Sequence, residues 1–126
     1  MKAIVLMSVF IASFSFAQAD LAEISDAIRL GDAKSLSYYF DQEIELNIGR
    51  VDDVYSKDQA VKVLHAFFGK YPPKSFRNLH HGASSTQHMK YYIGKLHTDS
   101  GTFRSTILLE EKAGKMLIKQ FSLERQ

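Results

Sequence analysis

The chain is 126 residues long, a length typical of one globular domain. Its 16 Lys and Arg residues nearly balance 14 Asp and Glu residues, and the charges are interspersed, which argues against nucleic-acid binding. Cysteine is absent, so disulfide bonds, thiol catalysis and cysteine-ligated zinc are all excluded.

The first nineteen residues have the layout of a secretory signal peptide. Lys2 precedes an apolar run from Ala3 to Phe16, and Ala17-Gln18-Ala19 supplies the small residues of a cleavage site. A membrane helix would need about twenty core-apolar residues, and this run is shorter and interrupted by serines. We expect export through the Sec pathway, to the periplasm or beyond the cell. Cleavage after Ala19, with Ala17 as the alternative, would leave residues 20–126 as one domain without a membrane span.

Two short helices are predicted at the start of the mature chain. Apolar residues recur at helical spacing over residues 20–30, where Asp20 and Glu23 form a capping-box pattern and Gly31 can end the helix. Asp32 can cap a second helix over residues 32–40. A strand follows over residues 42–49, in which Ile44, Leu46 and Ile48 alternate with polar residues, and residues 50–55 return from it.

The clearest helix spans residues 56–69. Ser56 and Gln59 form a capping box, Gly69 is expected to stop the helix, and Pro72-Pro73 prevent its return. Strands are then predicted near residues 75–81, 88–98, 102–111 and 115–125, joined by the turns "GASSTQ", "DSG" and "AG". Helices collected before a mainly antiparallel sheet indicate the α+β class.

Several short motifs resemble a family of small exported proteins, mainly from Bacteroidetes, that is classed as a domain of unknown function. They are Tyr55-Ser56-Lys57, Gln59-Ala60, Phe67-Phe68, Pro72-Pro73-Lys74-Ser75-Phe76, Ile93-Gly94, Leu96, Gly101 and Phe103-Arg104. The element order is similar to the nuclear transport factor 2-like fold. That resemblance implies a cone in which three helices from the N-terminal half pack on a curved, mostly antiparallel sheet. The superfamily includes both enzymes and binding modules, so the resemblance implies no single function.

Four of the five histidines lie within residues 78–97 and suggest a metal site. Zinc needs three or four ligands converging at about 2.0–2.3 Å, but adjacent strand residues such as His80 and His81 point to opposite faces. A simple "GASSTQ" hairpin places His81 opposite His88 and leaves His80 on the face of His97. The histidines therefore form two pairs, and we expect neither a metal nor another cofactor.

A pocket residue is easier to identify than a catalytic one. No strand carries an inward Asp or Glu that could act with histidine, and Asp41, Asp52 and Asp53 look like cap and turn residues. Arg104, in contrast, follows the alternation of Thr106 and Leu108; it points either into the cone, toward an anion, or outward to solvent.

Tyr55, Tyr91 and Tyr92 could supply amphipathic walls beside Arg104. We therefore expect a non-catalytic binding or interaction module with a small-molecule or peptide pocket between the helices and the concave sheet face. The resemblance adds homodimerisation through the sheet. The alternatives are an acid–base enzyme of the isomerase or dehydratase class, and a scaffold whose cone is filled by its core.

Overall fold

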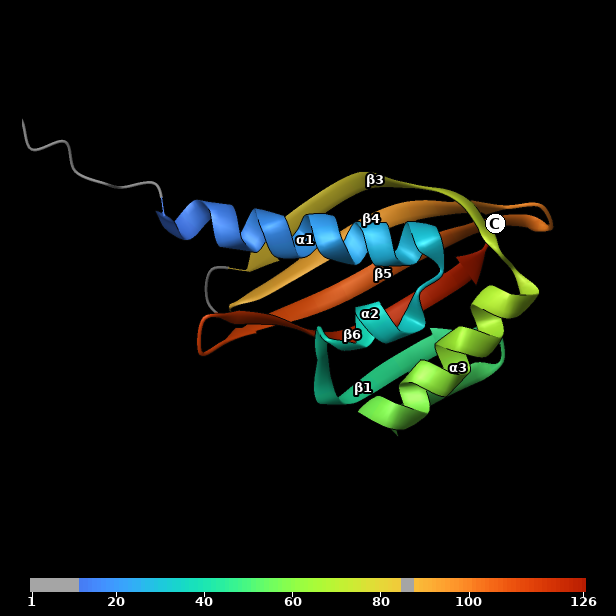
Figure 1. The fold of residues 1–126 in the computed structure, drawn as a ribbon, viewed down its shortest axis with the longest axis horizontal. Helices are drawn as coiled ribbons and strands as arrows, with labels where there is room; N and C mark the ends of the chain where they lie inside the picture. The colour runs from blue at the N-terminus through green and yellow to red at the C-terminus, as the bar shows by residue number, and fades with distance from the viewer. Residues whose placement is uncertain (1–11, 85–87) are drawn as a thin grey trace, which may run out of the picture.

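The computed structural model describes residues 12–84 and 88–126, with side chains from residue 20 onward except at Ser84. Three helices and six strands follow one another along the chain (Figure 1). Their bounds are α1 (Ala12–Leu30), α2 (Ala33–Ser37), β1 (Phe40–Ile48), β2 (Val51–Ser56), α3 (Lys57–Lys70), β3 (Pro73–Ser84), β4 (Met89–Thr98), β5 (Gly101–Lys112) and β6 (Lys115–Arg125). The predicted α+β order is confirmed.

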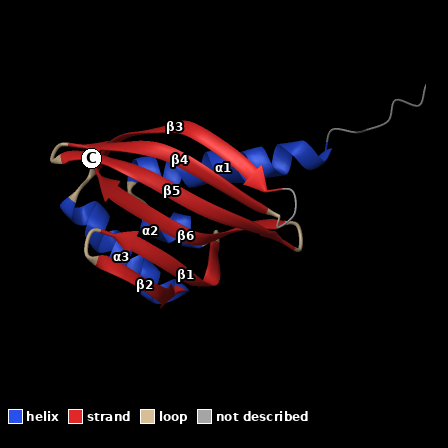
Figure 2. Cartoon of the chain, turned by 180° about the vertical axis from the view of Figure 1, so that it is seen from behind, coloured by secondary structure: helices blue, strands red, loops and turns tan. Residues whose placement is uncertain are grey.

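The six strands form one curved, open sheet in the order β2-β1-β6-β5-β4-β3. All neighbouring strands are antiparallel except β1 and β6, which are parallel. After β2 the chain passes through α3 to β3 at the opposite edge of the sheet, and β4, β5 and β6 then lead back to β1. All three helices lie on one face of the sheet, so that Figure 2, drawn from behind, shows the strands in front of them. The opposite face is therefore covered by none of the helices α1, α2 and α3.

The core lies between the helices and the sheet. Apolar residues alternate inward along the strands, as predicted for Ile44, Leu46 and Ile48, and the stripe of α3 buries Leu64, Phe67 and Phe68 against them. α1 packs over the β3 side of the sheet, while α3 packs over β1 and β2. Within the described residues, no helix is both long enough and apolar enough to cross a membrane.

The start of α3 agrees with the sequence prediction, whereas the start of α1 and the end of α3 differ from it. The capping box of α3 is present, with the Ser56 side chain accepting from the Gln59 backbone and the Gln59 side chain accepting from the Ser56 backbone. The predicted start of α1 at Asp20 is wrong, because the helix already begins at Ala12. No Gly or Pro interrupts the chain before Gly31, so nothing in the local sequence stops the helix from extending toward the N-terminus. α3 also continues through Gly69 to Lys70.

The hairpin of β3 and β4 has a different register from the one predicted. β3 continues to Ser84, so Gly82 pairs with Tyr91 instead of forming a turn, and a bulge lies between Asn78 and His80. The Tyr91 ring occupies the place where residue 82 would carry a side chain, since a Cβ there would lie 2.4 Å from the ring. His81 consequently pairs with Tyr92, and the predicted pairing of His81 with His88 is wrong.

Candidate functional site

The four residues predicted to form a pocket lie in separate places. Arg104 is exposed between the buried Phe103 and Ser105, on the sheet face away from the helices, which is the outward one of its two alternatives. Tyr91 is 36% exposed on that same face. Tyr92 packs partly against the core on the helix side, and Tyr55 does so from β2, near the other edge of the sheet.

The histidines are also spread over different surfaces. The His80 ring lies 3.3 Å from the Tyr91 hydroxyl on the uncovered face, whereas the His81 ring stacks on Tyr92 with 5.4 Å between centroids. His88 has a φ of 53°, and His97 contacts the Thr102 hydroxyl at 3.3 Å between Nδ1 and Oγ1. Among the described residues, no three His, Asp or Glu side chains are grouped closely enough to hold a metal ion.

Asp41 is not the cap or turn residue that the sequence suggested. It lies within β1, where its Oδ2 accepts hydrogen bonds from Lys119 Nζ at 2.7 Å and Lys112 Nζ at 3.2 Å. Its side chain is only 13% exposed, and Oδ1 accepts from the Gln42 backbone at 2.8 Å. The Lys119 hydrogen bond, followed by those from Gln42 and Lys112, lowers the pKa of Asp41 from 3.8 to about 2. Such a fully paired carboxylate is suited to stabilising the fold, and poorly suited to accepting a proton near neutrality.

A cavity of about 520 Å³ opens between α3 and the sheet, where β1 and β6 end. This volume falls within the range of about 300–1,000 Å³ that is usual for small-molecule pockets. Most of the wall is apolar and comes from the β1–β2 hairpin, α3, β5 and β6. These residues are Ile48, Gly49, Val51, Val63, Ala66, Phe67, Phe103 and Leu123. Lys70, Tyr71 and Arg125 complete the lining and supply its polar side chains.

The guanidinium of Arg125 is held in place by three contacts at the edge of this cavity. Nη1 donates to the Ser100 carbonyl oxygen at 2.7 Å. The guanidinium carbon lies 5.3 Å from the centre of the Tyr71 ring and 5.0 Å from that of Phe103, which are cation–π distances. Lys70 Nζ lies 5.4 Å from the same Tyr71 ring. Two cations therefore flank one tyrosine at the cavity edge.

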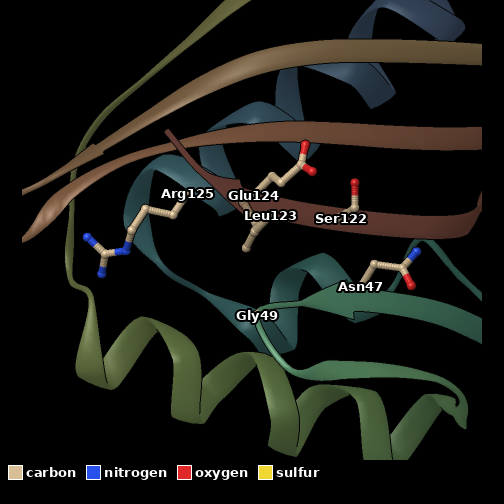
Figure 3. Close-up of a pocket in the computed structure, with 6 residues that line it drawn as sticks. All are labelled: Asn47, Gly49, Ser122, Leu123, Glu124 and Arg125. Atoms are coloured by element: carbon tan, nitrogen blue, oxygen red, sulfur yellow. The ribbon is translucent and has the colours of Figure 1, made fainter.

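A smaller hollow of about 280 Å³ lies beside the cavity at the ends of β1 and β6, and Arg125 lines both (Figure 3). The polar side chains of Asn47, Ser122 and Glu124 line this hollow. In Figure 3 the Arg125 side chain extends beyond the end of β6, away from these three. Gly49, Leu123 and Arg125 line both spaces.

The polar residues of the cavity were not predicted from the amino-acid sequence. Lys70 and Tyr71 end α3, where a basic residue has an ordinary structural role opposite the negative end of the helix dipole. Arg125 follows the last apolar residue of the predicted strand, where a charged side chain is ordinarily a solvated surface residue. The sequence feature that is linked to Arg125 is Gly101 in "DSGTF". A Cβ at this position would come within 2.5 Å of Arg125 Nη1. That feature can be interpreted only once β5 and β6 are paired.

Comparison with known proteins identifies the family and the fold. A protein from Bacteroides ovatus is 25% identical, with a TM-score of 0.79 over 83% of this chain and 94% of its own. A Bacteroides uniformis protein is 24% identical, with a TM-score of 0.78 over 83% and 95%. Both are DUF4783 family proteins.

A nuclear transport factor 2-like protein from Cytophaga hutchinsonii shares the fold at 13% identity, with a TM-score of 0.64 over 89% of this chain and 97% of its own. The predicted nuclear transport factor 2-like cone, with three helices on a curved and unclosed sheet, is thereby confirmed. No curated protein sequence matches the chain. Residues 21–124 match the family described as Domain of unknown function (DUF4783), and the chain belongs to this family.

Proposed function

We propose that this chain is a small-molecule-binding module whose ligand occupies the cavity between α3 and the sheet. The observation that carries the proposal is the cavity itself, about 520 Å³ in volume with mainly apolar walls. Phe67 and Phe103, whose ring centres are 5.1 Å apart, both line the cavity and offer aromatic surface to an apolar ligand.

The lining favours binding over acid–base catalysis. An isomerase or dehydratase needs a base positioned to accept the proton that it removes. None of the described residues that line the cavity is Asp, Glu or His. Lys70 and Tyr71 are lining side chains that can exchange a proton, but no carboxylate or imidazole accompanies them among the described residues, so an acid–base enzyme is the weaker alternative for this cavity.

The experiment is a fluorescence titration with the uncharged probe N-phenyl-1-naphthylamine. Ala66 lines the cavity from the exposed side of α3, so Ala66→Trp should fill the space without leaving a hole in the core. Ala22→Trp is the matched control, because Ala22 is exposed on α1 and does not line the cavity. We expect saturable binding to the wild type and Ala22→Trp, and much weaker binding to Ala66→Trp. The proposal is contradicted if the wild type does not bind the probe, or if Ala66→Trp binds it equally well.

We further propose that the chain is exported. Lys2, the apolar run and Ala17-Gln18-Ala19 support a cleaved signal peptide, and the family match begins just after it, at Leu21. Expression of the full chain in a bacterium with a working Sec pathway should yield a protein that starts at Asp20, or at Gln18 if cleavage follows Ala17. Intact-mass measurement tests this, and recovery of only the full-length chain would contradict it.

A second copy is proposed as a partner on the uncovered face of the sheet. On that face the exposed Tyr91 of β4 lies opposite Leu108 of β5, and Ile93 is next to them. Sedimentation velocity should detect a dimer that Leu108→Lys weakens. The control Leu30→Lys, at an exposed position of α1, should leave the dimer intact. A wild type that stays monomeric at high concentration would contradict the proposal.

A further inference from the structure

We propose that the ligand of the α3 cavity is an amphipathic anion, an apolar molecule with a carboxylate that lies between Arg125 and Lys70. This inference rests on the proposed function and adds the chemical class of the ligand. Three features of the cavity edge support it: the fixed position of Arg125, the lack of a carboxylate partner for either cation, and the contrast between this edge and the apolar wall.

The first feature is the way in which the chain holds Arg125. The residue at position 101 has a φ of 142°, a backbone conformation that favours glycine, and a Cβ there would come within 2.5 Å of Arg125 Nη1, so Gly101 leaves room for the guanidinium in this position. The neighbouring Ser100 carbonyl accepts from Nη1, while Tyr71 and Phe103 present their rings to the guanidinium. An arginine that is ordered before the ligand arrives loses less side-chain entropy on binding.

The second feature is the missing counter-charge. Across residues 12–84 and 88–126, neither Arg125 nor Lys70 forms an ion pair with a carboxylate. A guanidinium has five N–H donors, and the Ser100 bond uses only one group of Arg125. The remaining donors can form the paired hydrogen bonds that a carboxylate accepts from arginine.

Tyr71 indicates how these cations act on their surroundings. Its pKa is lowered, first by the interaction with the Arg125 side chain and then by the charge of Lys70. The cause is that both cations favour negative charge at the Tyr71 hydroxyl. The same field would favour a ligand carboxylate placed beside that hydroxyl.

The third feature is the abrupt change from charged edge to apolar wall. Val63, Phe67 and Leu123 are lining residues with no polar side-chain atoms; Phe67 and Leu123 are buried and Val63 is partly buried, whereas Lys70 and Arg125 are exposed. A small inorganic anion would contact only the cations and leave this wall in water. A molecule with both an apolar body and a carboxylate uses both parts, because burial of the apolar body adds to the charge-assisted hydrogen bonds.

The experiment compares three ligands that share one apolar chain. Decanoate, decan-1-ol and decylamine, each below its aggregation concentration, compete with N-phenyl-1-naphthylamine at constant ionic strength. We expect decanoate to bind at least about tenfold more tightly than decan-1-ol, a ratio that corresponds to about 1.4 kcal/mol, and decylamine to bind most weakly. Arg125→Gln should remove most of this preference. Lys70→Gln should remove part of the preference, and it should leave the fold stable because Lys70 is exposed at the end of α3.

Arg104→Gln is the matched control, because Arg104 is an exposed arginine on the uncovered sheet face. It should keep the full preference for decanoate. If decan-1-ol competes as well as decanoate, or if neither Arg125→Gln nor Lys70→Gln alters the preference, the anionic ligand is refuted while the cavity proposal stands. If the wild type does not bind the probe, both proposals fall.

Discussion

The ion pairs of Asp41 lead to the sharpest prediction about stability. Asp41 accepts from Lys119 and Lys112, which are 78 and 71 residues away in the sequence. Lys119 reaches it from β6 beside a register shift between β5 and β6, and the pairing of β1 with β6 is also irregular between Phe40 and Glu45. Asp41→Asn keeps the size of the side chain and removes its charge.

The magnitude follows from the pKa of Asp41. Its fall from 3.8 to about 2 corresponds to about 2.5 kcal/mol of unfolding free energy at about 1.4 kcal/mol per unit. Because both lysines are partly exposed, solvent screening reduces the expected cost of Asp41→Asn to about 1–2 kcal/mol near neutral pH. The folded pKa lies below the unfolded one. This contribution is therefore complete above the unfolded value of 3.8 and is lost as the pH falls through about 2.

Urea unfolding of the wild type and Asp41→Asn at several pH values between neutral and about 2 measures the effect. The difference between the two proteins should shrink steadily below about pH 4. Asp52→Asn serves as the control, since Asp52 is exposed on β2 and forms no ion pair within the described residues. The reasoning is refuted if the difference is independent of pH, or if Asp41→Asn costs no more than Asp52→Asn.

Three further substitutions test the packing and the caps, with the unfolding free energy as the measurement in each case. The fully buried Ser105 hydroxyl has no hydrogen-bond partner among the described residues, so Ser105→Ala should stabilise the protein by about 1 kcal/mol, and a loss would show that the hydroxyl is satisfied. Ser56→Ala should cost about 1 kcal/mol by removing the cap from Gln59, whereas Ser56→Asp should restore most of it; equal losses would contradict the cap. A Cβ at position 94 would lie 2.5 Å from the Phe76 ring, so Gly94→Ala should cost about 1–3 kcal/mol, and an unchanged midpoint would show that the ring moves freely.

The sequence predicted the features that depend on near neighbours. The capping box of Ser56 and Gln59 needs only four consecutive residues, and the inward alternation of β1 needs only seven. The pairing of Asp41 with Lys119 depends on β1 and β6 lying in parallel, which no local pattern specifies. Successive side chains of a β-strand point to opposite faces of the sheet. One bulge therefore reverses the expected face of every residue that follows it in the strand.

Arg104 and Arg125 show the same limit at the candidate site. The alternation predicted that Arg104 shares a strand face with Thr106 and Leu108, which is correct. It did not predict which face of β5 is buried, because Leu108 and Leu109 lie on opposite faces and both are apolar. In the fold, Leu109 is buried and Arg104 faces solvent. The cation beside the cavity is instead Arg125, and its position depends on Ser100, Gly101 and Tyr71, which lie more than twenty residues before it.

Lys119 and Arg125 are both cations of β6 but have different partners, so their roles in stability and in binding can be tested separately. Near its middle, Lys119 is neutralised by Asp41, so removing either partner should change stability and its dependence on acid. At its C-terminal end, Arg125 is held by a carbonyl and two aromatic rings without a carboxylate. If Arg125 served only the fold, Arg125→Gln should lower the unfolding free energy and leave the ligand preference unchanged. If Arg125 serves binding, Arg125→Gln should reduce the preference for decanoate over decan-1-ol even in conditions where the variant is fully folded. Asp41→Asn should leave that preference unchanged.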